Sequence, residues 1–374
     1  MKAKRQLLLI ALPAALVLMA MVVLISRQHV QLYNVTVLPT LGDSVTWVDA
    51  INDYGQVVGT SDVTGKFHIF LWDRENGMQD LGPAGTGRLD INNAGQIAGT
   101  MIDPNGNKQA FFWDPNNGRQ MLGTLGSDES VASGLNNRGQ VVGTLYSASR
   151  GPPGTRQKIG KAFIWDESAG MRELFPDERR ESSASAINDA GQIIGSMATY
   201  ESPVYPVPFF WDSNDPVGAP PLQFPDDYPG GRDLNNNGYV LGRTQHLDKD
   251  EQWVFLWTKE PGIEGIKYLF SFERLDGYST LELNDANQVV YGQVHTSAFE
   301  RFSKKHFPPY VQFYLRDPKR GTIILDKQVP REMGALVYFK DINNQGSIVG
   351  GIGLKDLGYG VPLLLEPIPE RWNK

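Results

Sequence analysis

Four acidic residues occupy the same position in a recurring sequence unit, two residues before an asparagine: Asp90, Asp233, Glu282 and Asp341. If the fold brings them together, their carboxylates could hold a cation such as Ca²⁺, and mutual repulsion would raise their pKa values. The simpler interpretation is that each carboxylate caps the turn that follows it, because the other three units have Ala50, Gly134 and Ala186 there. The sequence indicates no other metal and no cofactor.

Two long segments offer a different chemistry, a local excess of positive charge. Residues 144–160 contain Arg150, Arg156 and Lys158 and no acidic residue. Residues 293–309 contain Arg301, Lys304, Lys305 and His306 against one acidic residue. A positive patch would favour an anionic partner, such as an acidic envelope protein or an anionic polysaccharide. The alternative is that both segments are solvated insertions without a binding role.

Composition excludes several classes of function. The chain has 374 residues, with 35 Lys and Arg against 42 Asp and Glu. Four of the basic residues and none of the acidic ones precede residue 28, so the remainder carries a net charge of −11. Such an acidic domain is unsuited to binding nucleic acid through its phosphates. The absence of cysteine excludes disulfides and thiolate chemistry, and the sequence contains no phosphate loop, nucleophile elbow or Glu–His metal helix.

The elements that must position these residues come from a unit that recurs seven times. Ile51-Asn-Asp-Tyr-Gly-Gln-Val-Val-Gly59 returns in residues 91–99, 135–143, 187–195, 234–242, 283–292 and 342–350. The first asparagines of the units are Asn52, Asn92, Asn136, Asn188, Asn235, Asn284 and Asn343, spaced 40, 44, 52, 47, 49 and 59 residues apart. Intervals of about 40 to 50 residues are typical of the four-stranded blades of a β-propeller.

Each copy reads as two antiparallel strands joined by a tight turn, in which the asparagine accepts a backbone hydrogen bond and the glycine supplies a positive φ angle. In the sixth copy Asn287 replaces that glycine, and asparagine tolerates the left-handed region. The same copy has an extra residue before Gly292, which predicts a bulge in that strand. The glutamines after the turns are expected to bond backbone groups of the hairpin: Gln56, Gln96, Gln140, Gln192 and Gln288.

A third and a fourth strand follow each turn. The third is apolar on both faces, as in Phe70-Leu-Trp-Asp73, which is expected when neighbouring sheets cover both sides. The repeating tryptophans are therefore expected in the core. A glycine such as Gly77 and a short apolar strand come next. The predicted fold is all-β, a seven-bladed β-propeller of four-stranded blades that forms one domain over residues 32–369.

The N-terminus is predicted to complete the last blade. Leu38-Pro-Thr-Leu-Gly42 matches Leu122-Gly-Thr-Leu-Gly126, which belongs to a fourth strand, whereas the last repeat has no fourth strand of its own. Residues 33–38 should fill this gap and cover an edge that would otherwise be exposed. Residues 370–374 then form a C-terminal tail.

Together these motifs resemble the HAF-repeat family of bacterial exported proteins, which is named for a His-Ala-Phe triplet. The triplet appears here as His68-Ile-Phe70, Gln109-Ala-Phe111 and Lys161-Ala-Phe163. The resemblance covers nearly everything after residue 32. It implies an exported, β-propeller-like repeat protein, and it brings no activity and no catalytic residues with it.

One apolar segment indicates the location of the protein. Leu7 to Ser26 are twenty residues without a charge, about 30 Å long as a helix, which matches the core of a bilayer. The basic residues before it predict that residues 1–6 stay in the cytoplasm. We therefore expect one transmembrane signal-anchor helix over residues 7–26, a linker over 27–31 and the propeller on the periplasmic or extracellular side of a bacterial cytoplasmic membrane. Cleavage as a signal peptide, followed by secretion, is the alternative.

Three functions remain open at this stage. A binding or scaffolding module of the cell envelope, with an unidentified ligand, is the expected function because no catalytic motif is present. An enzyme, such as a hydrolase or lyase at the channel mouth, would require the four acidic residues to converge on one cavity. A structural module would bind no ligand. Propellers host both binding and catalysis, so the fold does not decide between these functions.

Overall fold

The computed structural model describes residues 30–42, 45–150, 156–176, 181–198, 207–212, 230–246, 251–258, 266–273, 280–295, 310–333, 336–353 and 360–372. The predicted cytoplasmic tail and signal-anchor, residues 1–26, lie outside these ranges. Within the ranges, no helix has both the length and the apolar character that crossing a membrane requires.

The chain divides into two compact units, which are described separately. One contains the two ends, residues 1–34 and 367–374. Its described part includes helix α2 (Pro369–Trp372), the hydrogen bond from the amide of Ile368 to the carbonyl of Leu32 (2.8 Å), and an edge-on contact between the rings of Tyr33 and Trp372 (5.0 Å between centroids). The other unit, Val35–Glu366, contains all seven repeats and is called the ring below.

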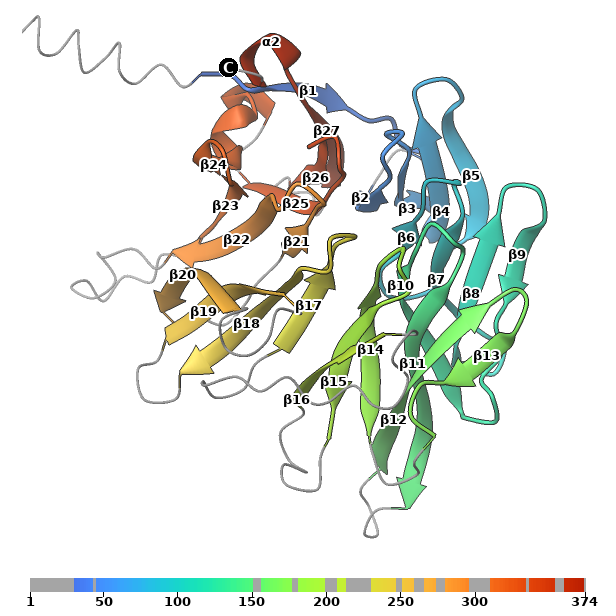
Figure 1. The fold of residues 1–374 in the computed structure, drawn as a ribbon. Helices are drawn as coiled ribbons and strands as arrows, with labels where there is room; N and C mark the ends of the chain where they lie inside the picture. The colour runs from blue at the N-terminus through green and yellow to red at the C-terminus, as the bar shows by residue number, and fades with distance from the viewer. Residues whose placement is uncertain are drawn as a thin grey trace, which may run out of the picture. The chain divides into compact units, whose positions relative to one another are not determined.

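The ring is a propeller of seven antiparallel sheets, its blades, which follow one another along the chain from blue to red in Figure 1. Blade 1 contains β2 (Thr46–Ile51), β3 (Val57–Val63), β4 (Lys66–Asp73) and β5 (Gly77–Pro83); blade 2 contains β6 (Asp90–Ile91), β7 (Ile97–Ile102), β8 (Lys108–Asp114) and β9 (Gly118–Met121); blade 3 contains β10 (Glu129–Leu135), β11 (Val141–Arg150), β12 (Arg156–Asp166) and β13 (Gly170–Glu173); blade 4 contains β14 (Ser182–Ile187), β15 (Ile193–Met197) and β16 (Val207–Trp211).

Blade 5 contains β17 (Gly230–Leu234), β18 (Val240–His246), β19 (Glu251–Trp257) and β20 (Ile266–Glu273); blade 6 contains β21 (Leu281–Leu283), β22 (Val289–His295), β23 (Tyr310–Asp317) and β24 (Gly321–Ile324), followed by the 3₁₀ turns η2 (Leu325–Gln328) and η3 (Arg331–Met333); blade 7 contains β25 (Leu336–Ile342), β26 (Ile348–Gly353) and β27 (Gly360–Pro367). The prediction of seven four-stranded blades is confirmed, with three strands of blade 4 among the described residues.

The fourth strand of blade 7 comes from the other end of the chain. The strand order of this sheet is β1-β27-β26-β25, with β1 (Tyr33–Val37) at its edge. Just after β1, the amide of Leu38 donates to the carbonyl of Pro362 at 2.9 Å. The Leu38 side chain is buried in a cluster with Val48 of blade 1 and Leu364 of blade 7. Strand pairing and core packing therefore close the ring at the same seam.

The hydrophobic core lies between blades rather than within single blades. One cluster joins Phe112 of blade 2 to Val141 and Trp165 of blade 3. The phenylalanines that open the third-strand motif are at most 1% exposed in blades 1 to 6. A methyl group on Gly59 would lie only 2.9 Å from the ring of Phe70, so glycine is needed at that point of the second strand. The burial of Trp165 at 3% and Trp72 at 7% confirms that these tryptophans belong to the core.

The turns between first and second strands have the predicted form. Gly55 has a φ angle of 77°, and Asn287, which replaces the corresponding glycine in blade 6, has a φ angle of 57°. The prediction of a bulge in the second strand of blade 6 is wrong, because its register with both neighbouring strands is continuous. Blade 1 has its bulge in the first strand, at Asp49, and blades 3, 4, 5 and 7 have theirs at the equivalent position. In blade 6 the extra residue, Tyr291, pairs directly with Leu281, so the insertion removes this bulge.

Candidate functional site: the mouth of the central channel

The seven repeated asparagines form a closed circle of hydrogen bonds around one end of the channel. Each asparagine donates from its side-chain Nδ2 to the backbone carbonyl of the corresponding asparagine in the next blade, at 2.9–3.0 Å. The bond from Asn343 to the carbonyl of Asn52 closes the circle. In Asn52, Oδ1 also accepts from the amides of Tyr54 and Gln56. The repeat motif therefore joins the blades and shapes the turns with the same side chain.

The glutamines after the turns bond side chains, which corrects the prediction that they bond the backbone. Gln96 accepts from Asn92 at 2.7 Å and donates to Asp114, the last residue of the third strand, at 2.9 Å. Gln192 and Gln288 donate to the equivalent aspartates, Asp212 and Asp317, at 3.1 and 2.6 Å. Each such pair fastens the turn of a blade to the third strand of the same blade.

Blade 5 lacks this glutamine, and blade 6 compensates for the loss. Tyr239 occupies the glutamine position, and Nδ2 of Asn235 donates instead to Oδ1 of Asn287 in blade 6, at 2.8 Å. At other seams the turn residue is glycine, and the glutamine of the preceding blade approaches it closely. Gln56 Oε1 lies 3.2 Å from where a Cβ atom of Gly95 would be. Asn287 therefore supplies the acceptor that blade 5 has lost.

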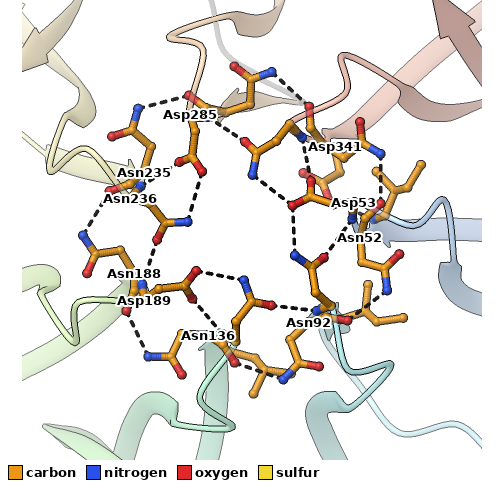
Figure 2. A pocket seen from close by; sticks show the side chains of 18 of the residues that line it. Asn52, Asp53, Asn92, Asn136, Asn188, Asp189, Asn235, Asn236, Asp285 and Asp341 are labelled. Carbon is orange, nitrogen blue, oxygen red and sulfur yellow. Dashed lines mark hydrogen bonds between the residues drawn. The ribbon is translucent and has the colours of Figure 1, made fainter.

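A second circle, called the outer ring below, surrounds the mouth one residue further along each turn. Its members are Asp53, Asn93, Asn137, Asp189, Asn236, Asp285 and Asn344. The backbone amide of each member donates to the side-chain Oδ1 of its counterpart in the next blade, at 2.7–2.9 Å. Figure 2 shows both circles of side chains around the pocket that they line, whose volume is about 180 Å³.

The outer ring retains hydrogen-bonding capacity for a ligand. Nδ2 of Asn93 and of Asn344 each donates one hydrogen bond to Oδ2 of Asp53, at 2.9 and 3.1 Å. An amide nitrogen carries two hydrogens, so each of these asparagines keeps one donor, and Oδ1 of Asp53 accepts only the amide of Asn344 and keeps a second lone pair. Among the described residues that line the pocket, Asp53, Asp189, Asp285 and Asp341 are acidic and none is basic. The mouth therefore suits a neutral or cationic polar group.

Around the same channel, the structure brings together the four predicted acidic residues, Asp90, Asp233, Glu282 and Asp341. Asp90 accepts hydrogen bonds from the amide of Ile91 in its own blade and from the amide of Leu135 in blade 3, at 2.9 and 2.8 Å. Asp233 joins blade 5 to blade 6 and Asp341 joins blade 7 to blade 1 in the same way. These aspartates fasten neighbouring blades together, and this bonding pattern differs from the predicted capping of a turn.

Arg88 provides the positive charge at the centre of this cluster. Its guanidinium bonds both carboxylate oxygens of Glu282 in blade 6, at 2.7 and 3.2 Å, and lies 3.8 Å from Asp341 in blade 7. Arg88 lies two residues before the first strand of blade 2, so one side chain connects three blades across the channel. Water still reaches 40% of the Arg88 side chain, whereas Glu282 is only 9% exposed.

The pKa values of the three aspartates of this cluster, and of Asp49 beside Arg88, are shifted upward. Burial, reinforced by the charge of Glu282, raises the pKa of Asp233 to about 7. Burial also raises the pKa of Asp49 to about 6, although the charge of Arg88 opposes this. The pKa values of Asp90 and Asp341 are raised by burial as well. Burial lowers the pKa of Arg88, but the surrounding carboxylates raise it by more, so the guanidinium stays charged.

The calcium site expected from the four acidic residues finds no support in this geometry. The described residues contain no group of three or more acidic or histidine side chains arranged to hold a metal ion. Glu282 faces Arg88, and Asp90, Asp233 and Asp341 accept hydrogen bonds from backbone amides. Arg88 and the backbone amides therefore take the place that a bound cation would have beside these carboxylates.

The predicted basic residues that the structure describes lie away from this site. Arg301, Lys304, Lys305 and His306 lie outside the described residues. Arg150 and Arg156 are register partners at the end of the β11–β12 pair, and Lys158 is paired with Glu129 at 2.6 Å. This connection follows a second strand, whereas the mouth is built from turns that follow first strands. In an antiparallel blade the two lie at opposite ends.

Two parts of the site were missed in the sequence. Arg88 has no counterpart, because blades 1, 3 and 4 have Val48, Ala132 and Ala184 at the same position. No repeated pattern could therefore have identified it. The outer ring did have a signal, since every repeated asparagine is followed by a second Asn or Asp. The repeated second Asn or Asp indicates a circle of side chains only when the blades are known to surround a common axis.

No family model and no curated protein sequence matches this chain. Among solved structures, the chain is similar to an oligogalacturonate lyase in complex with manganese, with 9% identity, 91% of this chain and 98% of that chain covered and a TM-score of 0.50. It is also similar to the acylaminoacyl peptidase of Pyrococcus horikoshii, with 11% identity, 85% of this chain covered and a TM-score of 0.56. The match spans 51% of the peptidase. At these identities the similarity establishes the propeller fold and nothing about the activity.

Proposed function

We propose that this protein is a membrane-anchored binding module of the cell envelope, and that the mouth of its channel holds the ligand. The outer ring is the observation that carries the proposal. Seven blades each place an Asn or Asp side chain at the edge of one pocket of about 180 Å³. Hydrogen bonds within the ring hold these side chains in place before a ligand arrives, which lowers the entropic cost of binding.

Charge defines the ligand further. Asp53, Asp189 and Asp285 give the outer ring three carboxylates, and no basic side chain among the described lining residues offsets them. An anionic group would be repelled from this mouth, whereas a hydroxyl group or an ammonium group would find acceptors. The proposed ligand therefore presents neutral or cationic polar groups.

Three monosaccharides of similar shape and different charge test this proposal. Glucosamine, glucose and galacturonate would be titrated into residues 30–374 by calorimetry. Affinity should decrease in that order, and the preference for glucosamine should weaken as salt is added. Equal affinity for all three, or binding of galacturonate alone, would contradict the proposed site.

A matched pair of variants assigns the effect to the outer ring. Asp53→Asn with Asp189→Asn and Asp285→Asn removes three charges and retains an Oδ1 acceptor in every blade. Asn93 and Asn137 already form such an Asn–Asn contact, at 2.7 Å. This variant should lose the preference for glucosamine. Glu75→Gln with Glu167→Gln and Glu370→Gln removes the same charge at exposed positions elsewhere, and it should retain the preference.

Anchoring to the membrane is a separate part of the proposal and rests on residues 7–26. The full chain should sediment with membranes and resist extraction by carbonate, and removal of residues 1–29 should release it. Release of the full chain by carbonate would overturn the anchor. The two basic segments, residues 144–160 and 293–309, are proposed to bind an anionic envelope partner, and reversal of Arg156 and Lys158 to glutamate should weaken this binding.

A hydrolase or lyase at the same mouth is the second candidate. One observation favours it: the pKa of Asp233, raised to about 7 by burial, suits a general acid or base near neutral pH. However, both oxygens of Asp233 already accept hydrogen bonds, from the amides of Leu234 and Leu283 at 2.8 and 2.7 Å. Cleavage of oligosaccharides by the wild-type protein that disappears in Asp233→Asn would favour this function over simple binding.

A further inference from the structure

A second cavity adjoins the mouth at the seam between blades 4 and 5. Its volume is about 560 Å³, and Gln192, Phe210, Asn236, Asn237, Tyr239 and Thr258 are among the residues that line it. We call it the seam groove. Asn236 lines both the seam groove and the mouth pocket, so the two cavities share a wall. A ligand that extended from the mouth past Asn236 would reach the groove.

The seam groove lies where blade 5 departs from the repeat. In blades 2, 4 and 6 a glutamine after the turn is bonded to an aspartate at the end of the third strand. Blade 5 has Tyr239 and Thr258 at these two positions, so the side-chain pair is missing. Both replacements line the groove. Departures from an otherwise regular repeat are expected at functional sites.

The lining of the groove combines two kinds of surface. Phe210 and Tyr239 contribute aromatic carbon, with the ring of Phe210 supported by Trp257 at 5.3 Å between centroids. Gln192, Asn237 and Thr258 contribute amide and hydroxyl groups. A sugar ring has the complementary composition, with apolar C–H faces that pack on aromatic rings and hydroxyls around its edge that bond amides.

The volumes of the two cavities indicate how many sugar units each could hold. The mouth pocket holds the volume of about six water molecules at roughly 30 Å³ each, and it is smaller than the roughly 300–1,000 Å³ of typical ligand pockets. The seam groove lies within that range. A ligand that used both cavities would have one end in the mouth and its following units in the groove.

We propose that the seam groove is a second subsite, and that the ligand is an oligosaccharide of neutral or amino sugars whose end enters the mouth. This proposal rests on the function proposed above, since it extends the same site. It adds a direction, because the chain leaves the mouth over Asn236 and continues between blades 4 and 5. It also adds a length, because binding should become tighter from a monosaccharide to an oligomer.

Calorimetry with glucosamine and its β-1,4-linked hexamer, and with glucose and cellohexaose, tests the subsite. At least one hexamer should bind the wild-type protein about tenfold or more tightly than its monomer, which corresponds to about 1.4 kcal/mol. Ala190 lines the groove at an exposed turn position, so Ala190→Trp should block the groove and reduce the hexamer to the affinity of the monomer.

Ala94→Trp is the matched control, because Ala94 has the same exposed turn position in blade 2, whose glutamine–aspartate pair is intact. It should bind the hexamer like the wild-type protein. Equal affinities for hexamer and monomer, or an Ala190→Trp variant that keeps the gain, would overturn the subsite while the mouth remains a binding site. If neither monomers nor hexamers bind, the proposed function fails together with the subsite.

Discussion

Arg88 should contribute measurably to the stability of the ring, because it joins blade 2 to blades 6 and 7 across the channel. Breaking a buried ion pair by removing one partner costs about 3–5 kcal/mol. Since 40% of the Arg88 side chain is exposed to water, we expect about half of this, about 2 kcal/mol, for Arg88→Gln. At about 2.1 cal/mol/K per residue, unfolding of a ring of about 330 residues has an entropy of about 0.7 kcal/mol/K. The melting temperature should therefore fall by about 3 °C.

The loss should depend on pH in a defined direction. The charge of Arg88 lowers the pKa values of Asp49, Asp90, Asp233 and Asp341, which burial raises. Without Arg88 these pKa values rise further in the folded protein and stay unchanged in the unfolded chain. A group with a raised pKa stabilises the folded state at low pH, and this contribution is lost as pH rises through the folded-state pKa. The deficit of Arg88→Gln should therefore be small at pH 5 and largest at pH 8.

Urea unfolding followed by tryptophan fluorescence at pH 5, 6.5 and 8 measures this deficit. Arg138→Gln is the control, because Arg138 is exposed on the turn of blade 3 and its replacement removes the same charge. A deficit that is equal at pH 5 and pH 8, or no larger than that of Arg138→Gln, would refute the assignment of Arg88 as the counter-charge of the cluster.

Four further predictions follow from the ring. Asp49→Asn should flatten the decline in stability between about pH 4 and pH 7 by about 1–2 kcal/mol, measured by urea unfolding, because the pKa of Asp49 is raised to about 6. Leu38→Ala should cost about 2–5 kcal/mol in the same assay, because Leu38 is 2% exposed at the closing seam. Asn343→Ala should cost about 1–3 kcal/mol, since it removes one of the two donors to the carbonyl of Asn52 and leaves the amides of Gln345 and Ser347 without their side-chain acceptor. Millimolar calcium should leave the melting temperature unchanged while Arg88 is present, and a reproducible rise would restore the cation site.

The fold could be predicted from the sequence because each blade repeats the same local chemistry. A tight turn needs its Asn and its glycine, and a strand buried on both faces needs apolar residues such as Phe70-Leu-Trp. Both requirements are local, so they are visible in a single repeat. The bulges depend on pairing between strands, and the extra residue Tyr291 was therefore assigned the wrong effect. Tyr291 pairs with Leu281, whose equivalent in blades 1, 3, 4, 5 and 7 is the bulged residue. This pairing becomes visible only when the register of the two strands is known.

The candidate site was only partly predictable, because its chemistry depends on contacts between blades. The repeated position of Asp90, Asp233, Glu282 and Asp341 suggested convergence as one alternative, beside the capping of separate turns. Their partners were not predictable, since Arg88 occurs in one blade and the amides that Asp90 and Asp233 bind belong to neighbouring blades. The long basic segments were conspicuous in the sequence, yet the described part of one of them, at Arg150 and Arg156, lies at the end of blade 3 opposite the mouth.

The contact between Asn235 and Asn287 has a consequence for how this chain can change over generations. Around most of the circle, every blade supplies its own acceptor for the asparagine of its turn, and a mutation there affects that blade first. At the seam of blades 5 and 6 the acceptor for Asn235 belongs to the next blade, in the side chain of Asn287. The residues at positions 239 and 287 therefore depend on each other. Replacing Tyr239 alone with the glutamine of the repeat would place that side chain against Asn287. Replacing Asn287 alone with the glycine of the repeat would leave Nδ2 of Asn235 with one acceptor fewer. The two codons, 48 residues apart, can revert to the repeat sequence only together, although each would be ordinary in any other blade.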